Sequence, residues 1–180
     1  MDQQPIFYYD LGSPHCYLVA ETIMTALPVV PEWEPVLAAE LDRETLDREL
    51  IERLVGEHGL QPLRWPRTWP PDSERAMLAA TYAKRIGRAV AFSLAAFRQA
   101  FAGGRDLGDE DTILIAGAAC EMHPTALRKG IELAGTATAL RAATCRARQA
   151  GATGLPAIQV GDGVYAGVDA IGEATAALRA

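Results

Sequence analysis

Hydrophobic and polar residues change pattern several times along the chain. Residues 6–9 form a short run of Ile, Phe and Tyr, which is typical of a strand buried on both faces. Gly12 interrupts this run, and the apolar residues that follow predict a helix from about Pro14 to Leu27. A second strand is expected within residues 28–37, with prolines at its margins. The first part of the chain therefore predicts a βαβ unit.

The middle of the chain has a helical pattern. From Asp42 onward, apolar residues recur at steps of three and four with acidic residues between them. The positions concerned are Leu46, Leu50, Ile51, Leu54 and Val55. Further helices are expected from Ser73 through Ile86, from Ala89 to Phe101, from Thr112 to Met122 and from Ala137 to Ala150.

The last part of the chain has strand character again. Residues 153–160 place a proline directly before a β-like run, and residues 161–163, Gly-Asp-Gly, favour a hairpin turn. Residues 164–166 would be the returning strand, and a final helix is expected to about Leu178. The C-terminal part therefore predicts the order helix, strand, strand, helix.

Composition and charge narrow the class of protein. The chain has 180 residues, 49% of them hydrophobic, which is enough for one sizeable core with a subdomain inserted in it. A net charge of −6 argues against nucleic-acid and anionic-membrane partners, which require basic patches. No run is apolar over the length of a membrane span, and residues 1–5 do not resemble a secretion signal. We therefore expect a cytoplasmic protein.

The cysteines do not suggest a disulfide scaffold. Cys16, Cys120 and Cys145 are odd in number and form no Cys-x-x-Cys pair, so we expect reduced thiols and no metal site. Cys120 and Cys145 fall within predicted helices, where a buried, unreactive thiol is the ordinary case.

Ser13 stands at the point where chemistry is expected. Followed by Pro14, it is predicted to cap the first helix, because proline suits the first helical position. The positive end of that helix would favour an anion, such as a thiolate, beside Ser13 and Cys16. A Ser-Pro pair at a helix start also occurs without any function, so this pattern alone leaves both interpretations open.

A family resemblance favours the functional interpretation. Ser13-Pro14-His15-Cys16 resembles the Cys-Pro-His-Cys redox motif of the DsbA family, with serine in place of the first cysteine. With the Tyr-Leu pair that follows, it is also similar to the 2-hydroxychromene-2-carboxylate isomerases and the kappa-class glutathione transferases. The resemblance implies an α/β thioredoxin fold, with residues 1–41 and 135–180 as the thioredoxin-like domain and residues 42–134 as an inserted α-helical subdomain.

The same resemblance implies a binding site for a small thiol. Glutathione or another low-molecular-weight thiol would contact Ser13, Pro14, Leu155 and Pro156, with Leu155-Pro156 in the cis form and facing the first helix. Asp169 corresponds to the aspartate that helps to hold the amino group of glutathione. Its neighbours Val168 and Ala170 depart from the family pattern, and capping of the last helix is the alternative role of Asp169.

Candidate substrate-wall residues are His15, Trp65 and Trp69. The two tryptophans belong to a proline-rich loop at residues 64–73, which could either line a cleft or pack over the edge of the core. Asp72 stands in this loop where the isomerases usually have asparagine.

The resemblance implies a homodimeric, thiol-dependent isomerase or transferase acting on a small electrophilic substrate. Ser13 would donate a hydrogen bond to the thiolate, and Cys16 would lie in the same site. No lysine precedes Lys84, whereas the isomerases tend to place one near the active site. Two alternatives remain open: a DsbA-like thiol-disulfide oxidoreductase that uses Cys16, and a noncatalytic thioredoxin-fold binding module.

Overall fold

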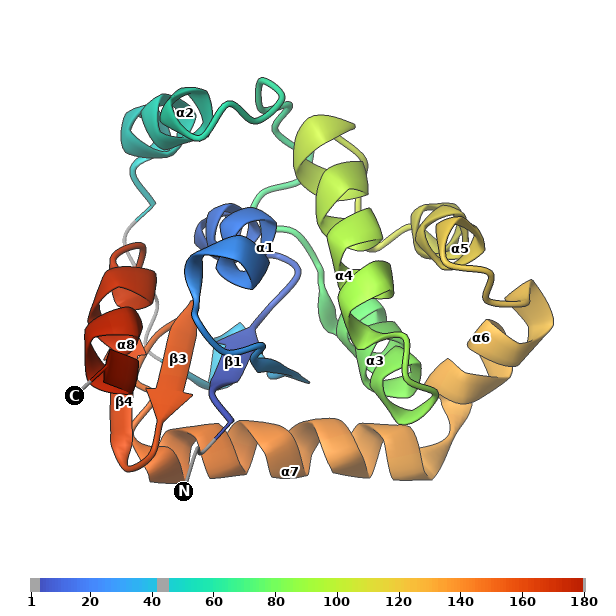
Figure 1. Cartoon of the computed structure of the whole chain (residues 1–180). Helices are drawn as coiled ribbons and strands as arrows, with labels where there is room; N and C mark the ends of the chain where they lie inside the picture. Colours follow the sequence, from blue (N-terminus) through green and yellow to red (C-terminus); the bar gives the residue numbers. More distant parts are fainter. Residues whose placement is uncertain (1–3, 42–45, 180) are drawn as a thin grey trace.

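A four-stranded mixed sheet lies at the centre of the molecule (Figure 1). The computed structural model describes residues 4–41 and 46–179. The strands are β1 (Ile6–Tyr9), β2 (Glu32–Pro35), β3 (Ala157–Val160) and β4 (Gly163–Ala166). Their order is β2-β1-β3-β4, with β1 parallel to β2 and antiparallel to β3, and with β3 and β4 forming a hairpin. This topology confirms the predicted α/β class and thioredoxin fold.

Helices cover the sheet and extend beyond it. They are α1 (Pro14–Ala26), α2 (Arg48–Glu57), α3 (Glu74–Arg85), α4 (Ala89–Phe97), α5 (Glu110–Ala119), α6 (Pro124–Glu132), α7 (Ala134–Ala150) and α8 (Ala170–Arg179). A 3₁₀ turn, η1 (Ala38–Glu40), follows β2, and a π-helical segment, η2 (Arg98–Ala102), continues α4.

The second strand is shorter than the sequence predicted. Only Glu32–Pro35 pairs with β1, because the prolines around it lack the N–H group that a ladder requires. Val30, inside the predicted strand, is 58% exposed. Since β2 is an edge strand paired on one side only, Pro35 can occupy its last position.

Two predicted helix boundaries also differ from the structure. The helix expected from Asp42 begins at Arg48 with Asp47 as its cap, and residues 42–45 lie outside the described residues. The helix expected to reach Met122 ends at Ala119, because Glu121 has a positive φ of 60° and cannot continue an α-helix.

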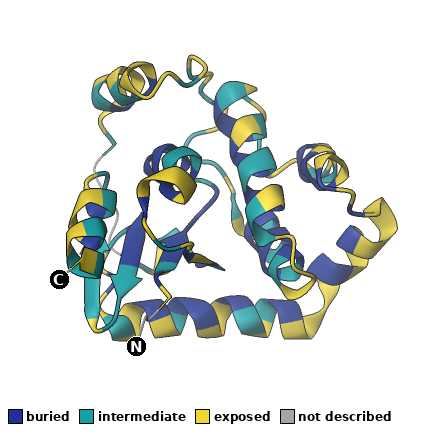
Figure 2. Ribbon diagram, in the orientation of Figure 1, coloured by how far each residue is buried: buried dark blue, intermediate teal, exposed yellow. Residues whose placement is uncertain are grey.

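Aromatic side chains join the sheet to the helices. Phe7 and Tyr9 of β1 stack with ring centroids 5.3 Å apart, and Trp33 of β2 packs edge-on against both. Tyr9 also contacts Phe97 of α4, and its hydroxyl lies 2.6 Å from Ser93 Oγ. Complete burial raises the pKa of the Tyr9 hydroxyl well above its ordinary value. Figure 2 shows β1 as buried and most of α2 as exposed.

The two sides of the sheet carry different helices. In Figure 1, α7 lies along one side and α1 along the other, where α1 contacts α8. Helices α2 to α6 fall between β2 and α7 in the chain, and of these α3 contacts β2 and α7 while α4 contacts α1. The proposed boundaries of the inserted subdomain stay a prediction. Within residues 4–41 and 46–179, no helix has both the length and the apolar character needed to cross a membrane.

Candidate active site

The turn between β1 and α1 places Ser13 at the start of the helix. Ser13 has an extended backbone conformation (φ −97°, ψ 119°), and its Oγ accepts a hydrogen bond from the Cys16 N–H at 3.2 Å. Pro14 is the first helical residue, as the sequence predicted. The cap uses one lone pair of the Ser13 hydroxyl, and its O–H remains able to donate to a ligand.

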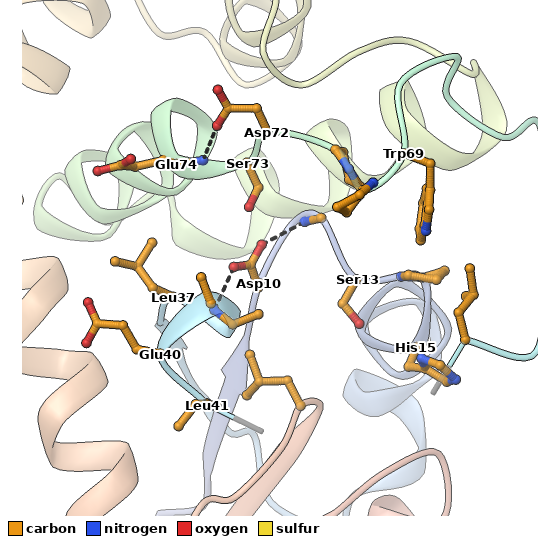
Figure 3. A pocket seen from close by; sticks show the side chains of 18 residues that line it. Asp10, Ser13, His15, Leu37, Glu40, Leu41, Trp69, Asp72, Ser73 and Glu74 are labelled. Atoms are coloured by element: carbon orange, nitrogen blue, oxygen red, sulfur yellow. Dashed lines mark hydrogen bonds between the residues drawn. The ribbon is translucent and has the colours of Figure 1, made fainter. Parts of the chain in front are cut away.

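A pocket of about 630 Å³ opens beside this turn (Figure 3). Four segments of the described chain contribute its lining. These are Asp10 and residues 12–15, residues 37–41 with Leu46, residues 69–74, and Leu155. The pocket therefore joins the start of α1 to η1, the start of α3 and the loop before β3.

Five of the predicted site residues line this pocket. They are Ser13, Pro14, His15, Trp69 and Leu155. The Leu155-Pro156 bond is cis, as expected, and Leu155 is buried beside the turn that carries Ser13. Residues 142 positions apart in the sequence therefore share one cavity (155 − 13 = 142).

The structure places the other predicted residues away from the cavity surface. Cys16 has no exposed area in the structure and is not among the lining residues. Pro156 is buried, and Asp169 is exposed immediately before α8. None of these three side chains belongs to the lining of the pocket that Ser13 faces.

Trp65 supports the pocket wall from behind. Its ring packs edge-on against Trp69 at 5.3 Å, and its Nε1 donates to Glu52 of α2 at 2.7 Å. The Arg48 guanidinium lies 4.7 Å from the Trp65 ring centroid, in cation–π geometry. Of the two tryptophans predicted for the substrate wall, Trp69 lines the pocket and Trp65 does not.

Asp10 is a pocket residue that the sequence analysis missed. Its side chain is 3% exposed, and it accepts hydrogen bonds from the backbone N–H groups of Gly12 (2.8 Å) and Ala38 (2.9 Å). Burial raises the pKa of this carboxyl group, opposed by hydrogen bonds from Ala38, Gly12 and Ser73. The sequence feature that could have identified Asp10 is its position between a buried strand and a Gly-Ser turn, because a buried charge needs hydrogen-bond partners.

The outer part of the pocket is acidic. Glu40, Asp72 and Glu74 line it and are exposed. Figure 3 shows Glu40 and Glu74 on the side of the pocket away from Ser13 and His15. Asp72 also accepts a hydrogen bond from the Glu74 N–H at 3.3 Å, which helps α3 to begin. The described part of the chain contains no group of three or more His, Cys, Asp or Glu side chains that could hold a metal ion.

This arrangement provides a site for a small anion attached to a larger, partly apolar body. The dipole of α1 favours negative charge beside Ser13. Trp69, Pro70 and Leu155 offer apolar surface next to that position. A helix N-terminus and a cis-proline loop meeting at one pocket define the class of thioredoxin-fold proteins.

The chain belongs to the DSBA-like thioredoxin domain family, whose model matches residues 6–179. Solved structures agree with this fold. A 2-hydroxychromene-2-carboxylate isomerase superposes with a TM-score of 0.84 at 17% identity, over 98% of this chain and 95% of that one. A probable DsbA oxidoreductase from Streptomyces coelicolor gives a TM-score of 0.77 at 19% identity, over 97% and 88%.

A third similar structure is of a protein with a small thiol, GSH. It is the cytosolic disulfide reductase DsbM from Pseudomonas aeruginosa with GSH, with a TM-score of 0.66 at 14% identity, over 90% of this chain and 88% of that one. No curated protein sequence matches the chain. At these identities the solved structures establish the fold, and the relatives in this family include both isomerases and thiol-disulfide oxidoreductases.

Proposed function

We propose that this protein is a thiol-dependent isomerase or transferase of the 2-hydroxychromene-2-carboxylate isomerase type. Glutathione or another small thiol would bind with its sulfur beside Ser13. The observation that carries this proposal is the position of Ser13, whose hydroxyl caps α1 at an open pocket while the nearby Cys16 is fully buried. A hydroxyl here can stabilise a ligand's thiolate but cannot form a disulfide with it.

The residues around Ser13 fit a thiol ligand. The Ser13 O–H donates to the sulfur, and the N-terminus of α1 lowers the pKa of the bound thiol by favouring its anionic form. The backbone of Leu155, before the cis-proline, would pair with the extended peptide part of glutathione. Bound glutathione supplies a thiolate that adds to an electrophilic carbon of the substrate.

The substrate would occupy the apolar part of the same pocket. Trp69, Leu37 and Leu41 provide surface for a small organic molecule, and His15 lies at the Ser13 end. Two similar structures support this proposal. The isomerase supports the type of reaction, and the disulfide reductase with GSH supports a small thiol as the ligand. Asp169 remains a candidate contact for the amino group of glutathione.

The test is binding of reduced glutathione to the wild type and to Ser13→Ala. We expect the wild type to bind glutathione at neutral pH with the ultraviolet absorption of a thiolate. Ser13→Ala should weaken binding about tenfold to a hundredfold and reduce the thiolate signal, because a hydrogen bond to a charged group contributes about 1.5–3 kcal/mol.

Thr22→Ala is the matched control. It removes a hydroxyl from the same helix at a position where Oγ1 bonds only to the backbone carbonyls of Leu18 and Val19. This variant should bind glutathione like the wild type. Absence of binding at millimolar glutathione would favour the noncatalytic binding module, and dithiol oxidation lost in Cys16→Ser would favour the oxidoreductase.

A further inference from the structure

We propose that Asp10 is a positioning residue, whose buried carboxylate ties the Ser13 turn to the opposite wall of the pocket. Three segments meet at this one side chain: the β1–α1 turn, the start of η1 and the start of α3. The link to thiol binding rests on the proposed function, whereas the positioning itself can be tested without a ligand.

The two carboxylate oxygens serve different segments. Oδ1 accepts from the Gly12 N–H at 2.8 Å, within the turn itself. Oδ2 accepts from the Ala38 N–H at 2.9 Å, and Ala38, the first residue of η1, lines the pocket. The Ser73 side chain, next to α3, acts on the same carboxyl group and lowers its pKa. A neutral amide could not accept at both oxygens, since one of them would become an NH₂ donor.

The junction is also closely packed. A Cβ atom added at Gly12 would lie 3.1 Å from Ser73 Cβ and 3.3 Å from Asp10 Oδ1. Glycine is therefore the residue that allows the turn to approach α3 this closely. The adjacent Leu11 N–H contacts Met77 Sδ of α3 at 3.1 Å, which fixes the turn to the same helix a second time.

Asp10 reaches Ser13 directly through the backbone. The Asp10 carbonyl accepts from the Ser13 N–H at 3.1 Å, and Ser13 Oγ in turn accepts from the Cys16 N–H. Through its bonds to the Gly12 and Ala38 N–H groups, the carboxylate fixes this turn, and with it the Ser13 hydroxyl and the first amides of α1, relative to residues 37–41. A ligand that contacts both the helix start and this wall depends on that spacing.

The experiment removes the Ala38 N–H group, which donates to Asp10 Oδ2, and leaves Asp10 unchanged. Ala38→Pro deletes the Ala38 N–H, and proline is compatible with the first position of η1 because Leu37 is extended (φ −89°, ψ 112°). Ala38→Val keeps the N–H and adds a side chain of similar size, so it is the matched control. Asp10→Asn and the double variant Asp10→Asn/Ala38→Pro complete a cycle.

The main readout is the amide resonances of Ser13 and Cys16 in ¹⁵N–¹H correlation spectra. We expect Ala38→Pro to shift both resonances, although Ala38 is 25 positions from Ser13 (38 − 13 = 25), and Ala38→Val to leave them near the wild-type positions. In the Asp10→Asn background, Ala38→Pro should add little, because the tie is already broken. Unchanged resonances, or equal shifts in both backgrounds, would overturn the positioning role.

Glutathione binding provides the second readout. If the positioning serves the thiol site, Ala38→Pro should lower glutathione affinity about tenfold, whereas Ala38→Val should lower it less. Unchanged affinity together with shifted resonances would overturn the link between Asp10 and thiol binding. If the wild type binds no glutathione, the proposed function fails, and the resonance cycle still decides the role of Asp10.

Discussion

Serine at position 13 combines two features that differ in origin. The cap geometry comes from the Ser-Pro sequence, and the access to a pocket comes from the packing of residues 37–41 and 69–74 around it. With serine at this position, the dipole of α1 still favours a thiolate beside it, as in a redox motif. Serine itself cannot form a mixed disulfide, so thiol-disulfide exchange at this position is lost. The position can therefore be tested by restoring the missing sulfur.

Ser13→Cys creates Cys-Pro-His-Cys at the start of α1. We expect the new thiol to pair with Cys16, and the disulfide to be strongly oxidising, toward about −120 mV, because the helix N-terminus and His15 stabilise the thiolate of the reduced form. The measurement is equilibration with glutathione redox buffers, followed by thiol trapping. The wild type should be nearly inert in the same dithiol oxidation assay.

Either of two results would contradict this expectation. Equal oxidase activity in the wild type and in Ser13→Cys would mean that Cys16 alone carries redox chemistry. A correctly folded variant whose new thiol never pairs with Cys16 would mean that the turn is not of the redox type.

Asp10 makes the stability of the protein depend on pH in a defined direction. Burial raises the pKa of its carboxyl group above the ordinary value of 3.8. Between pH 3.8 and the raised pKa, the folded state therefore binds a proton that the unfolded state has lost. The contribution of this group to stability is therefore complete below pH 3.8 and is lost as pH rises through the raised pKa. We expect the free energy of unfolding of the wild type, relative to Asp10→Asn, to fall across that window.

Urea unfolding of both proteins at a series of pH values would measure this difference. Other titrating groups cancel, because they are the same in the two proteins. A difference that stays constant with pH, or that grows as pH rises, would contradict the direction given above.

At the scale of elements, one glycine allows α6 to pack against α3. A Cβ atom added at Gly130 would lie 2.4–2.6 Å from ring atoms of Tyr82, whereas Gly56 of α2 has open space around it. We expect Gly130→Ala to destabilise the protein by about 1–3 kcal/mol through overpacking. Gly56→Ala, the matched control, should stabilise it by about 0.5–1 kcal/mol, since alanine favours the helix.

Thermal and urea unfolding of the two variants would test this packing. A stabilising Gly130→Ala would mean that α3 and α6 can move apart without cost. That result would contradict the close contact between these helices.

The acidic side of the pocket comes from two elements, with Glu40 in η1 and Glu74 at the start of α3. Glutathione carries a net negative charge, so these carboxylates should oppose its binding. We expect Glu40→Gln/Glu74→Gln to increase glutathione affinity about twofold to fivefold, and added salt to reduce the gain through screening.

Glu49→Gln is the control for this pair. Glu49 is an exposed residue of α2 that is not among the pocket-lining residues, so the change alters the net charge without altering the pocket. The control removes one charge and the double variant removes two. A gain in binding free energy from the control of about half that from the double variant would therefore show that net charge, rather than the position of the carboxylates, governs thiol binding.

Across the whole molecule, the cysteines belong to separate helices. Cys16 lies in α1, Cys120 at the end of α5 and Cys145 in α7. A disulfide requires Cα atoms within about 7 Å, so we expect no intrachain disulfide. After mild oxidation, thiol titration of the denatured protein should give three thiols, and rapid loss of two would contradict this prediction.

The sequence was informative wherever local preferences and tertiary packing agree. The alternation of strand and helix patterns, the Ser-Pro cap and the turn before β4 all depend on backbone preferences of neighbouring residues, and the structure contains each of them. The family resemblance added the cis bond at Leu155-Pro156, which the structure also contains. These features were predictable because their causes lie within a few positions in the chain or in a recognisable motif.

The pocket and its polar contacts depended on the tertiary structure. The sequence could not show that Trp69 lines the cavity while Trp65 lies behind it, since both occupy one loop and packing decides between them. The role of Asp10 was equally hidden, because its partners at Ala38 and Ser73 lie 28 and 63 positions away (38 − 10 = 28; 73 − 10 = 63). A buried carboxylate is stabilised by donors that only the folded chain brings to it.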